Sequence, residues 1–313
     1  MSDRTERTTS EDSSAPGRIE RLKAKAERLF DRAPAPVRAT LEIAGRTVAD
    51  FMADGSPRLA AAISYFVLIT LAPLLMLAVT FAGILFERAD VRATILELVG
   101  TWTGDAGVVV VAEVLTGIAE AQAGGGLTFA GIAVALFGAS VLFHQLQAAL
   151  NIIWDVPEPG DGVLGVIRRR ALTFLMVVVV GVLLIAAMLL GSGIVDLLES
   201  FVPLFGQVGW LTEWFISLAA ATVLFAIVFT ILPDRSIAWR DTLVGAFVTS
   251  LLFNGGAAII GRYLATSGTG SVYGAASSFA VFLVWLFYST QVFLLGAQFT
   301  HVWAERREAA RDS

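Results

Sequence analysis

The sequence predicts an all-α polytopic membrane protein with six transmembrane helices, amphipathic interfacial helices and both termini in the cytoplasm. Three observations lead to this prediction. The chain of 313 residues is 56% hydrophobic and only 16% charged, whereas an ordinary soluble domain carries roughly 25% charged residues. The charged residues leave six long apolar runs, and the basic residues gather on alternate sides of those runs. The absence of cysteine also excludes a disulfide scaffold, a Cys-ligated metal centre and a thiolate nucleophile.

Each of the six uncharged runs is long enough to cross a bilayer as a helix, which takes about 20 apolar residues at 1.5 Å per residue. The runs are continuous, whereas the strands of a membrane barrel alternate over about ten residues. They also lack the polar face that a helix of a soluble protein needs. The uncharged runs cover 59–86, 121–154, 171–195, 214–233, 242–261 and 263–304. We expect spans near 60–85, 128–152, 172–195, 212–232, 243–264 and 277–300.

The basic residues predict the orientation of these spans. Of the 22 Lys and Arg residues, 19 lie before the first span, in the loops after spans two and four, or in the C-terminal tail, and three lie on the opposite side. Positively charged residues stay on the cytoplasmic side. We therefore expect a multi-pass protein of the cytoplasmic (inner) membrane with its N- and C-termini in the cytoplasm.

Four segments follow from this arrangement. We expect 1–17 to be a disordered cytoplasmic tail, 57–304 to be the six-helix membrane domain and 305–313 to be a short cytoplasmic tail. Residues 18–56 show apolar residues at helical spacing with basic residues opposite, interrupted by prolines. Such helices either bind the anionic lipids of the inner leaflet or pack against the cytoplasmic loops, and both interpretations stay open. A homo-oligomer is a further arrangement that the sequence allows.

The loop at 87–127 is long for a connection between two spans. Apolar residues repeat at helical spacing before and after Gly104 and Gly107, which interrupt the pattern. We expect two helices that lie on the outer face of the membrane or dip into it.

Polar residues inside the expected spans are candidates for a substrate pathway, because hydrocarbon offers them no water. Residues 144, 147 and 151 share one helical face, and His144 can titrate near neutral pH. The competing interpretation is hydrogen bonding between helices, worth about 0.6–2 kcal/mol per contact, which we favour for the Gln and Asn residues; a lone His is likewise more often structural. We assign no special role to His301. The pathway candidates are His144, Gln147, Asn151, Asn254, Tyr288, Gln291 and Gln298.

Two further features indicate bending. Pro73 lies inside the first span, where its missing N–H predicts a kink. The glycine-rich segment before the sixth span contains Gly268, Gly270 and Gly274 and predicts a flexible hinge on the outer face, with an anion-binding nest as the alternative.

Known catalytic and nucleotide-binding motifs are absent from the sequence. It contains no P-loop, no H-E-x-x-H, no G-x-S-x-G and no paired metal-ligand motif. We expect no metal, no cofactor and no enzymatic activity, and the lack of a P-loop excludes an ATP-driven pump. The triplet Arg168, Arg169 and Arg170 lies where the topology already demands positive charge, so we expect no nucleic-acid partner.

Several short motifs occur together and in order between residues 40 and 307. They are LAAAISY at 59–65, LFG at 136–138, NIIW at 151–154, LPDR at 232–235, VYGAASS at 272–278 and GAQF at 296–299. In these motifs the chain resembles the YihY/BrkB family of bacterial inner-membrane proteins. The resemblance implies a six-span inner-membrane protein. Members of that family carry a ribonuclease label or are linked to serum resistance and to transport of envelope lipids or solutes.

Three functional hypotheses follow. The first is a transporter or flippase-like protein for an envelope lipid or an amphiphilic or small solute, driven by an ion gradient with His144 as a protonation site. The second is a non-transporting scaffold that organises envelope proteins through its basic N-terminal helices. The third is a membrane-bound hydrolase or ribonuclease, which we rank last because two histidines and no carboxylate cluster provide no acid/base pair.

Overall fold

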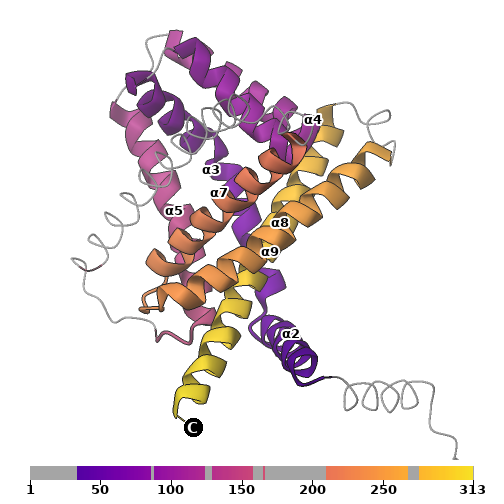
Figure 1. Ribbon diagram of the computed structural model, residues 1–313. Coiled ribbons are helices and arrows are strands. Elements are labelled where there is room, and N and C mark those ends of the chain that lie inside the picture. The colour runs from indigo at the N-terminus through magenta and orange to yellow at the C-terminus, as the bar shows by residue number, and fades with distance from the viewer. Residues whose placement is uncertain are drawn as a thin grey trace, which may run out of the picture. The chain divides into compact units, whose positions relative to one another are not determined.

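The structure is all-α wherever it is described. A computed structural model describes residues 34–85, 88–123, 129–157, 165, 209–266 and 275–312, and these residues contain no strand (Figure 1). Two compact units divide the chain, residues 1–45 and 46–313, and all packing discussed below lies within the second unit. The helices are α2 (Ala35–Ala53), α3 (Ser56–Leu85), α4 (Arg88–Ala123), α5 (Phe129–Ile153), α7 (Gly209–Ile231), α8 (Trp239–Thr266) and α9 (Ala275–Asp312).

The helices agree with five of the six expected spans. Helices α3, α5, α7, α8 and α9 cover those five apolar runs. The expected span 172–195 lies outside the described residues, as do the tail at 1–17 and the hinge glycines Gly268, Gly270 and Gly274. The expected tail at 305–313 differs in form, because α9 continues without a break to Asp312. Its last two turns are polar, which lets a membrane helix extend into water without a cap.

One of the two expected interruptions is seen in the described helices. Pro73 lies inside α3, which continues through it as a single helix, so the kink expected there stays a prediction. The segment after the first span forms α4, whose two halves meet at Gly104, where φ is 65° and ψ is −167°. Glycine adopts this left-handed backbone without the steric cost that a Cβ brings, so the residue that interrupts the sequence pattern also breaks the helix.

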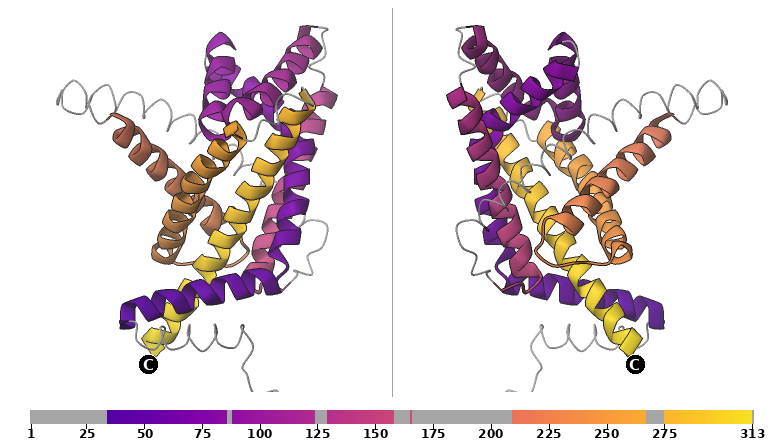
Figure 2. Two further views of the ribbon diagram at one scale, coloured as in Figure 1. Left: turned by 90° about the vertical axis from the view of Figure 1, so that its right-hand side faces the viewer. Right: turned by 90° about the vertical axis from the view of Figure 1, so that its left-hand side faces the viewer.

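Helix α9 is the central element of the packing. It contacts the pair formed by α3 and α5 and also the pair formed by α7 and α8. In both views of Figure 2, α9 lies between these two pairs. Helix α4 packs against α3 and α9. Among the described residues, the two pairs are therefore joined mainly through α9.

Close contact between α8 and α9 depends on two glycines that face each other's threonine neighbours. A Cβ at Gly245 would overlap the side chain of Thr300, and a Cβ at Gly296 would overlap that of Thr249. Each threonine hydroxyl donates to the carbonyl of the glycine four residues before it, at 2.7 Å. The same Gly-x-x-x-Thr unit therefore occurs once on each helix and faces its counterpart. Small residues at such positions let membrane helices approach closely.

Two helical stretches have the length and hydropathy of a bilayer span, Ser56–Met76 in α3 and Ser278–Arg311 in α9, and Ser217–Ile231 in α7 is a shorter apolar helix. Only 22% and 33% of the apolar windows of the two longer stretches are buried. Large apolar side chains face outward on them. Tyr65 and Ile69 are exposed on α3, and Phe279 and Val284 on α9. The core helix of a soluble protein hides such a surface, whereas a bilayer solvates it.

The helix ends that the sequence assigns to the cytoplasm lie together, and we call this end of the bundle the inner end. It comprises the start of α3, the ends of α5 and α7, the start of α8 and the last turns of α9. Side-chain contacts described below connect these helix ends to one another. These described helix ends thus meet at one end of the bundle, and the side of the membrane on which this end lies stays a prediction.

Candidate functional site: a polar cluster at the inner end

The end of α5 and the turn between α7 and α8 are joined by reciprocal hydrogen bonds. The Asn151 Nδ2 donates to Asp234 Oδ2 at 2.8 Å, and the Asp234 backbone N–H donates to Asn151 Oδ1 at 2.9 Å. Gln147 Nε2 donates to the second carboxylate oxygen of Asp234 at 3.2 Å. Pro233 stops α7 just before this turn, since proline cannot continue the hydrogen-bond ladder. The aspartate is thereby placed against two amides that lie one turn apart on α5.

The neighbouring residue strengthens the same contact. Arg235 Nη1 donates to the Trp154 carbonyl at 3.3 Å, and its guanidinium lies 5.7 Å from the centre of the Trp154 ring. A cation over an indole face contributes roughly 0.5–2 kcal/mol, depending on its exposure. We call Gln147, Asn151, Trp154, Asp234 and Arg235 the inner lock.

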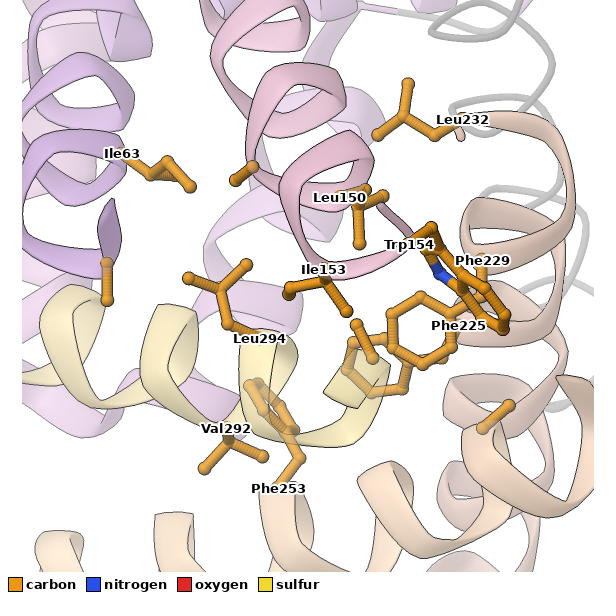
Figure 3. Packing of buried hydrophobic residues seen from close by; sticks show 14 of the residues in the cluster. Ile63, Leu150, Ile153, Trp154, Phe225, Phe229, Leu232, Phe253, Val292 and Leu294 are labelled. Carbon is orange, nitrogen blue, oxygen red and sulfur yellow. The ribbon is translucent and has the colours of Figure 1, made fainter. Parts of the chain in front are cut away.

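Apolar packing supports the inner lock from within. Figure 3 shows Leu150 and Trp154 of the α5 end beside Phe225 and Phe229 of α7. Leu150 is fully buried and Trp154 is 3% exposed. The polar contact therefore covers a well-packed apolar cluster at the inner end.

A second group of polar side chains lies beside the lock. The imidazole of His301 packs on the Trp154 ring with centroids 4.9 Å apart. Its Nε2 lies 3.2 Å from Glu305 Oε1, and Glu305 also pairs with Arg46 of α2. Arg46 in turn lies 3.4 Å from Asp50. This chain of charges connects α2 to α9 at the inner end.

Several buried polar atoms of this group have no hydrogen-bond partner in the structure. They include Gln298 Oε1, Trp154 Nε1 and His301 Nδ1, whereas His301 Nε2 lies 3.2 Å from Glu305 Oε1 without the geometry of a hydrogen bond. Gln298 is 2% exposed and His301 is 6% exposed. A buried polar group without a partner costs about 1–3 kcal/mol, and the described residues carry other such atoms as well, among them Trp285 Nε1 and the Ser289 hydroxyl.

The pKa of the Asp54 carboxyl in this region departs from its ordinary value. Desolvation by burial raises its pKa above the ordinary aspartate value, and the negative charges of Asp155 and Asp50 raise it further. A hydrogen bond from the Gln298 side chain and the nearby His301 act in the opposite direction. Asp54 stands in the turn between α2 and α3, outside the apolar part of the helices.

A further ion pair secures α8 to α9. Arg307 Nη1 contacts the carboxylate of Asp241, which is 5% exposed in the first turn of α8. A carboxylate in a first helical turn also interacts favourably with the helix dipole. The pair holds the start of α8 against the last turns of α9.

The predicted pathway residues separate into different environments. Gln147 and Asn151 belong to the inner lock, whereas His144, one turn further from the inner end, is exposed. Gln298 lies in the group around Asp54. Gln291 is half-buried on α9.

The other two predicted residues bond between helices. Asn254 accepts a hydrogen bond from the Ser217 hydroxyl at 3.3 Å and donates to the Ser250 carbonyl at 2.9 Å. The Tyr288 hydroxyl donates to the Leu252 carbonyl at 2.8 Å. The structure therefore does not bring the seven candidates together on one continuous surface of the described residues.

Sequence reasoning missed Asp54, Trp154, Asp234 and His301 as members of this region. The sequence signal for Asp234 and Arg235 is the LPDR motif at 232–235. The sequence analysis assigns no role to His301. Among the described residues, no group of three or more His, Asp or Glu side chains is arranged to hold a metal ion.

Long apolar helices with outward-facing apolar side chains define the chain as a helical membrane protein. The chain belongs to the BrkB (YihY/BrkB) family, because the family model described as Virulence factor BrkB matches residues 47–313. This confirms the resemblance seen in the motifs. No solved structure matches this chain.

The chain is also similar to proteins named UPF0761 membrane protein. The relative from Alkalilimnicola ehrlichii is 28% identical over 263 residues, which cover 81% of this chain and 56% of that protein. The relative from Azotobacter vinelandii is 24% identical over 258 residues, or 79% of this chain and 60% of that protein. The relative from Rhodospirillum centenum is 32% identical over 170 residues, which cover 53% of this chain and 36% of that protein. This chain thus matches about 36–60% of the length of these relatives.

Proposed function

We propose that this chain is a transporter or flippase-like protein of the cytoplasmic membrane that moves an envelope lipid or an amphiphilic small solute. The observation that carries the proposal is the inner lock. Its hydrogen bonds join α5, which packs on α3, to the turn of the α7–α8 pair. Elsewhere the two pairs are connected mainly through α9. Separation of the lock would let the pairs move apart at the inner end while α9 holds them together.

The strength of the lock suits a contact that opens and closes. Hydrogen bonds between membrane helices contribute about 0.6–1.7 kcal/mol each. Three such bonds contribute a few kcal/mol to the closed state, in addition to the apolar cluster of Leu150, Trp154 and Phe229 beneath them, and a ligand that binds the open state better would shift the balance toward it. A continuous apolar interface of the same length would give no comparable way to open one end.

The side chains around this contact favour an amphiphile as substrate. Polar groups of the lock gather at the inner end, whereas Phe137 on α5, together with Phe215 and Val223 on α7, is apolar and exposed. A lipid-like molecule can place its head group against the amides and carboxylate and its chain along such apolar side chains.

Reconstituted vesicles test this proposal. Protein in liposomes that contain a fluorescent phosphatidylglycerol should increase the fraction of probe that is bleached by external dithionite, and Asn151→Ala and Asp234→Asn should change that rate several-fold. Glu308→Gln, an exposed change on α9, serves as control and should leave the rate unchanged. The proposal would be contradicted if the wild type and the variants all showed no lipid movement and no osmotic swelling in small solutes.

Cysteine chemistry provides an independent test of the lock itself. Since the chain has no cysteine, Asn151→Cys with Asp234→Cys places two thiols at the contact without background. A short bifunctional thiol reagent should stop transport by holding the inner end closed, and mono-functional reagent should not. Equal transport with and without the cross-link would show that this end does not open.

A scaffold that binds the anionic inner leaflet is the second candidate, and α2 favours it. Val48 and Met52 are exposed on α2, at 54% and 63%, although Phe51 between them is buried. Such a face fits a helix that lies in the lipid head-group region. Deletion of residues 1–50, which removes most of α2, should abolish the protein partnerships of a scaffold and spare the activity of a transporter.

A further inference from the structure

We propose that the outer side of α8 binds an anionic phospholipid, whose phosphate pairs with Arg240 and whose acyl chain lies along Val244, Phe247 and Leu251. Helix α8 packs against α7 and α9, and these four residues are exposed on the side of the helix that this packing leaves open. We call them the α8 stripe. The bound lipid is a resident of this surface, so the proposal goes beyond transport and does not depend on it.

The spacing of the α8 stripe gives it the length of one lipid layer. Its three apolar residues follow Arg240 by four, seven and eleven positions, which places them on the same helical face. Gly255, four positions after Leu251, has no atom within 4 Å of its Cβ position, so the face stays open beyond the stripe. From Arg240 to Leu251 the helix rises about 17 Å at 1.5 Å per residue. One leaflet supplies about half of a hydrocarbon core of roughly 30 Å, so the stripe can follow an acyl chain along most of its depth.

The positive charge at the start of the stripe is not neutralised by any described residue. Arg240 is exposed, and within the described part of the chain its guanidinium makes no hydrogen bond or ion pair. The adjacent carboxylate of Asp241 is buried and pairs with Arg307, and Asp234 is bonded to the amides of the inner lock. A guanidinium can donate two parallel hydrogen bonds to a phosphate. Arg240 therefore complements an anionic head group better than a zwitterionic one, whose ammonium group it repels.

Two neighbours of the stripe have the character of a membrane interface. Trp239, the first residue of α8, is exposed, and so is Leu243 one turn further along. Tryptophan is enriched where head groups meet hydrocarbon, because its ring is apolar and its N–H is polar. Trp239 thus marks the head-group level beside Arg240. A second copy of this chain fits the surface less well, because it would bury a guanidinium for which the described residues provide no partner.

Native mass spectrometry of the full-length protein in detergent tests the site by counting the lipids that stay bound. Phosphatidylglycerol and phosphatidylethanolamine with identical acyl chains are added at equal concentration. We expect the wild type to retain phosphatidylglycerol several-fold more, and Arg240→Gln to lose most of this preference. Arg311→Gln removes the same charge from an exposed position near the end of α9 and should leave the preference unchanged. Equal retention of the two lipids by the wild type, or an equal loss in the two variants, would overturn the proposal.

The apolar part of the site is tested separately. Phe247→Ala should reduce the retention of phosphatidylglycerol several-fold, whereas Phe279→Ala, which shortens a phenylalanine of α9 with nearly the same exposure, should not. Glycerophosphoglycerol, the head group without acyl chains, should compete only weakly with the intact lipid. Competition as strong as that of the lipid would show that the stripe plays no part and would overturn the proposal. A protein dimer that Phe247→Ala abolishes, with no lipid retained, would instead assign the surface to a second copy of the chain.

Discussion

Gly256 of α8 lies directly against the phenol of Tyr288 on α9, and no Cβ fits between them. The same tyrosine hydroxyl donates to the Leu252 carbonyl, one turn earlier on α8. The absence of a side chain at one residue thus lets the other reach the backbone of the neighbouring helix. Gly255, the next residue in sequence, has no atom within 4 Å of its Cβ position.

Gly256→Ala should destabilise the protein by about 1–3 kcal/mol, because overpacking forces a shift of the tyrosine or of the helices. Gly255→Ala is a matched control, since it makes the same chemical change with open space around it. We expect this control to be neutral or slightly stabilising, because alanine favours helix more than glycine does. Thermal unfolding in detergent measures both, and equal melting temperatures would contradict the observed contact.

The ion pair between Asp241 and Arg307 should contribute more than an exposed pair does. Asp241→Asn is expected to cost about 1–3 kcal/mol, because it leaves Arg307 without its charged partner in a partly buried place. Arg307→Gln should cost a similar amount. The double variant should lose less than the sum of the two single variants, and Arg311→Gln at the exposed end of α9 should be neutral. Additive losses would show that the two residues do not interact.

Asp54 should make stability depend on pH with a defined sign. Burial first, and then Asp155 and Asp50, raise its pKa in the folded protein. Its contribution to stability is therefore fully present below the unfolded-state pKa of about 3.9 and is lost as the pH rises through the folded-state value.

The variant Asp54→Asn, which cannot ionise, should accordingly be more stable than wild type at neutral pH. The advantage should vanish at a pH below the unfolded-state value, where both proteins carry a neutral side chain. Unfolding measured across pH with Glu308→Gln as control checks this. A constant difference at every pH would assign the effect to packing instead of charge.

Labelling of single cysteines checks the orientation that the basic residues predict. Asp105→Cys places a thiol at an exposed position of α4, and Arg311→Cys places one at an exposed position near the end of α9. In intact cells, a membrane-impermeant maleimide should react with the first after passage through the outer envelope, and with the second only after permeabilisation of the inner membrane. Labelling of both from the same side would refute the expected topology.

The fold was largely predictable because bilayer-spanning helices are determined by local composition. Uninterrupted apolar runs set the positions of α3, α5, α7, α8 and α9, and Gly104 marked the break in α4. Six crossings and the cytoplasmic placement of both termini stay predictions, since the run at 172–195 lies outside the described residues.

The candidate site was predictable only in part, because its partners are distant in sequence. Asn151 was identified as a polar residue in a span, but its partner Asp234 is 83 residues away and lies in a turn. Hydropathy says nothing about which turn meets which helix end. His301 was set aside because its position near a helix end looks ordinary, and only its contact with Trp154 reveals its surroundings.

Helix α9 runs unbroken for 38 residues, about 57 Å at 1.5 Å per residue, which is nearly twice the roughly 30 Å of a hydrocarbon layer. A continuous helix of that length can move as one rigid body. A tilt imposed where Tyr288 meets α8 would sweep Arg307 and Glu305 sideways in the aqueous phase. In the expected six-span topology, a tilt of α9 at one face of the membrane would therefore move its residues at the other face without any rearrangement within the helix.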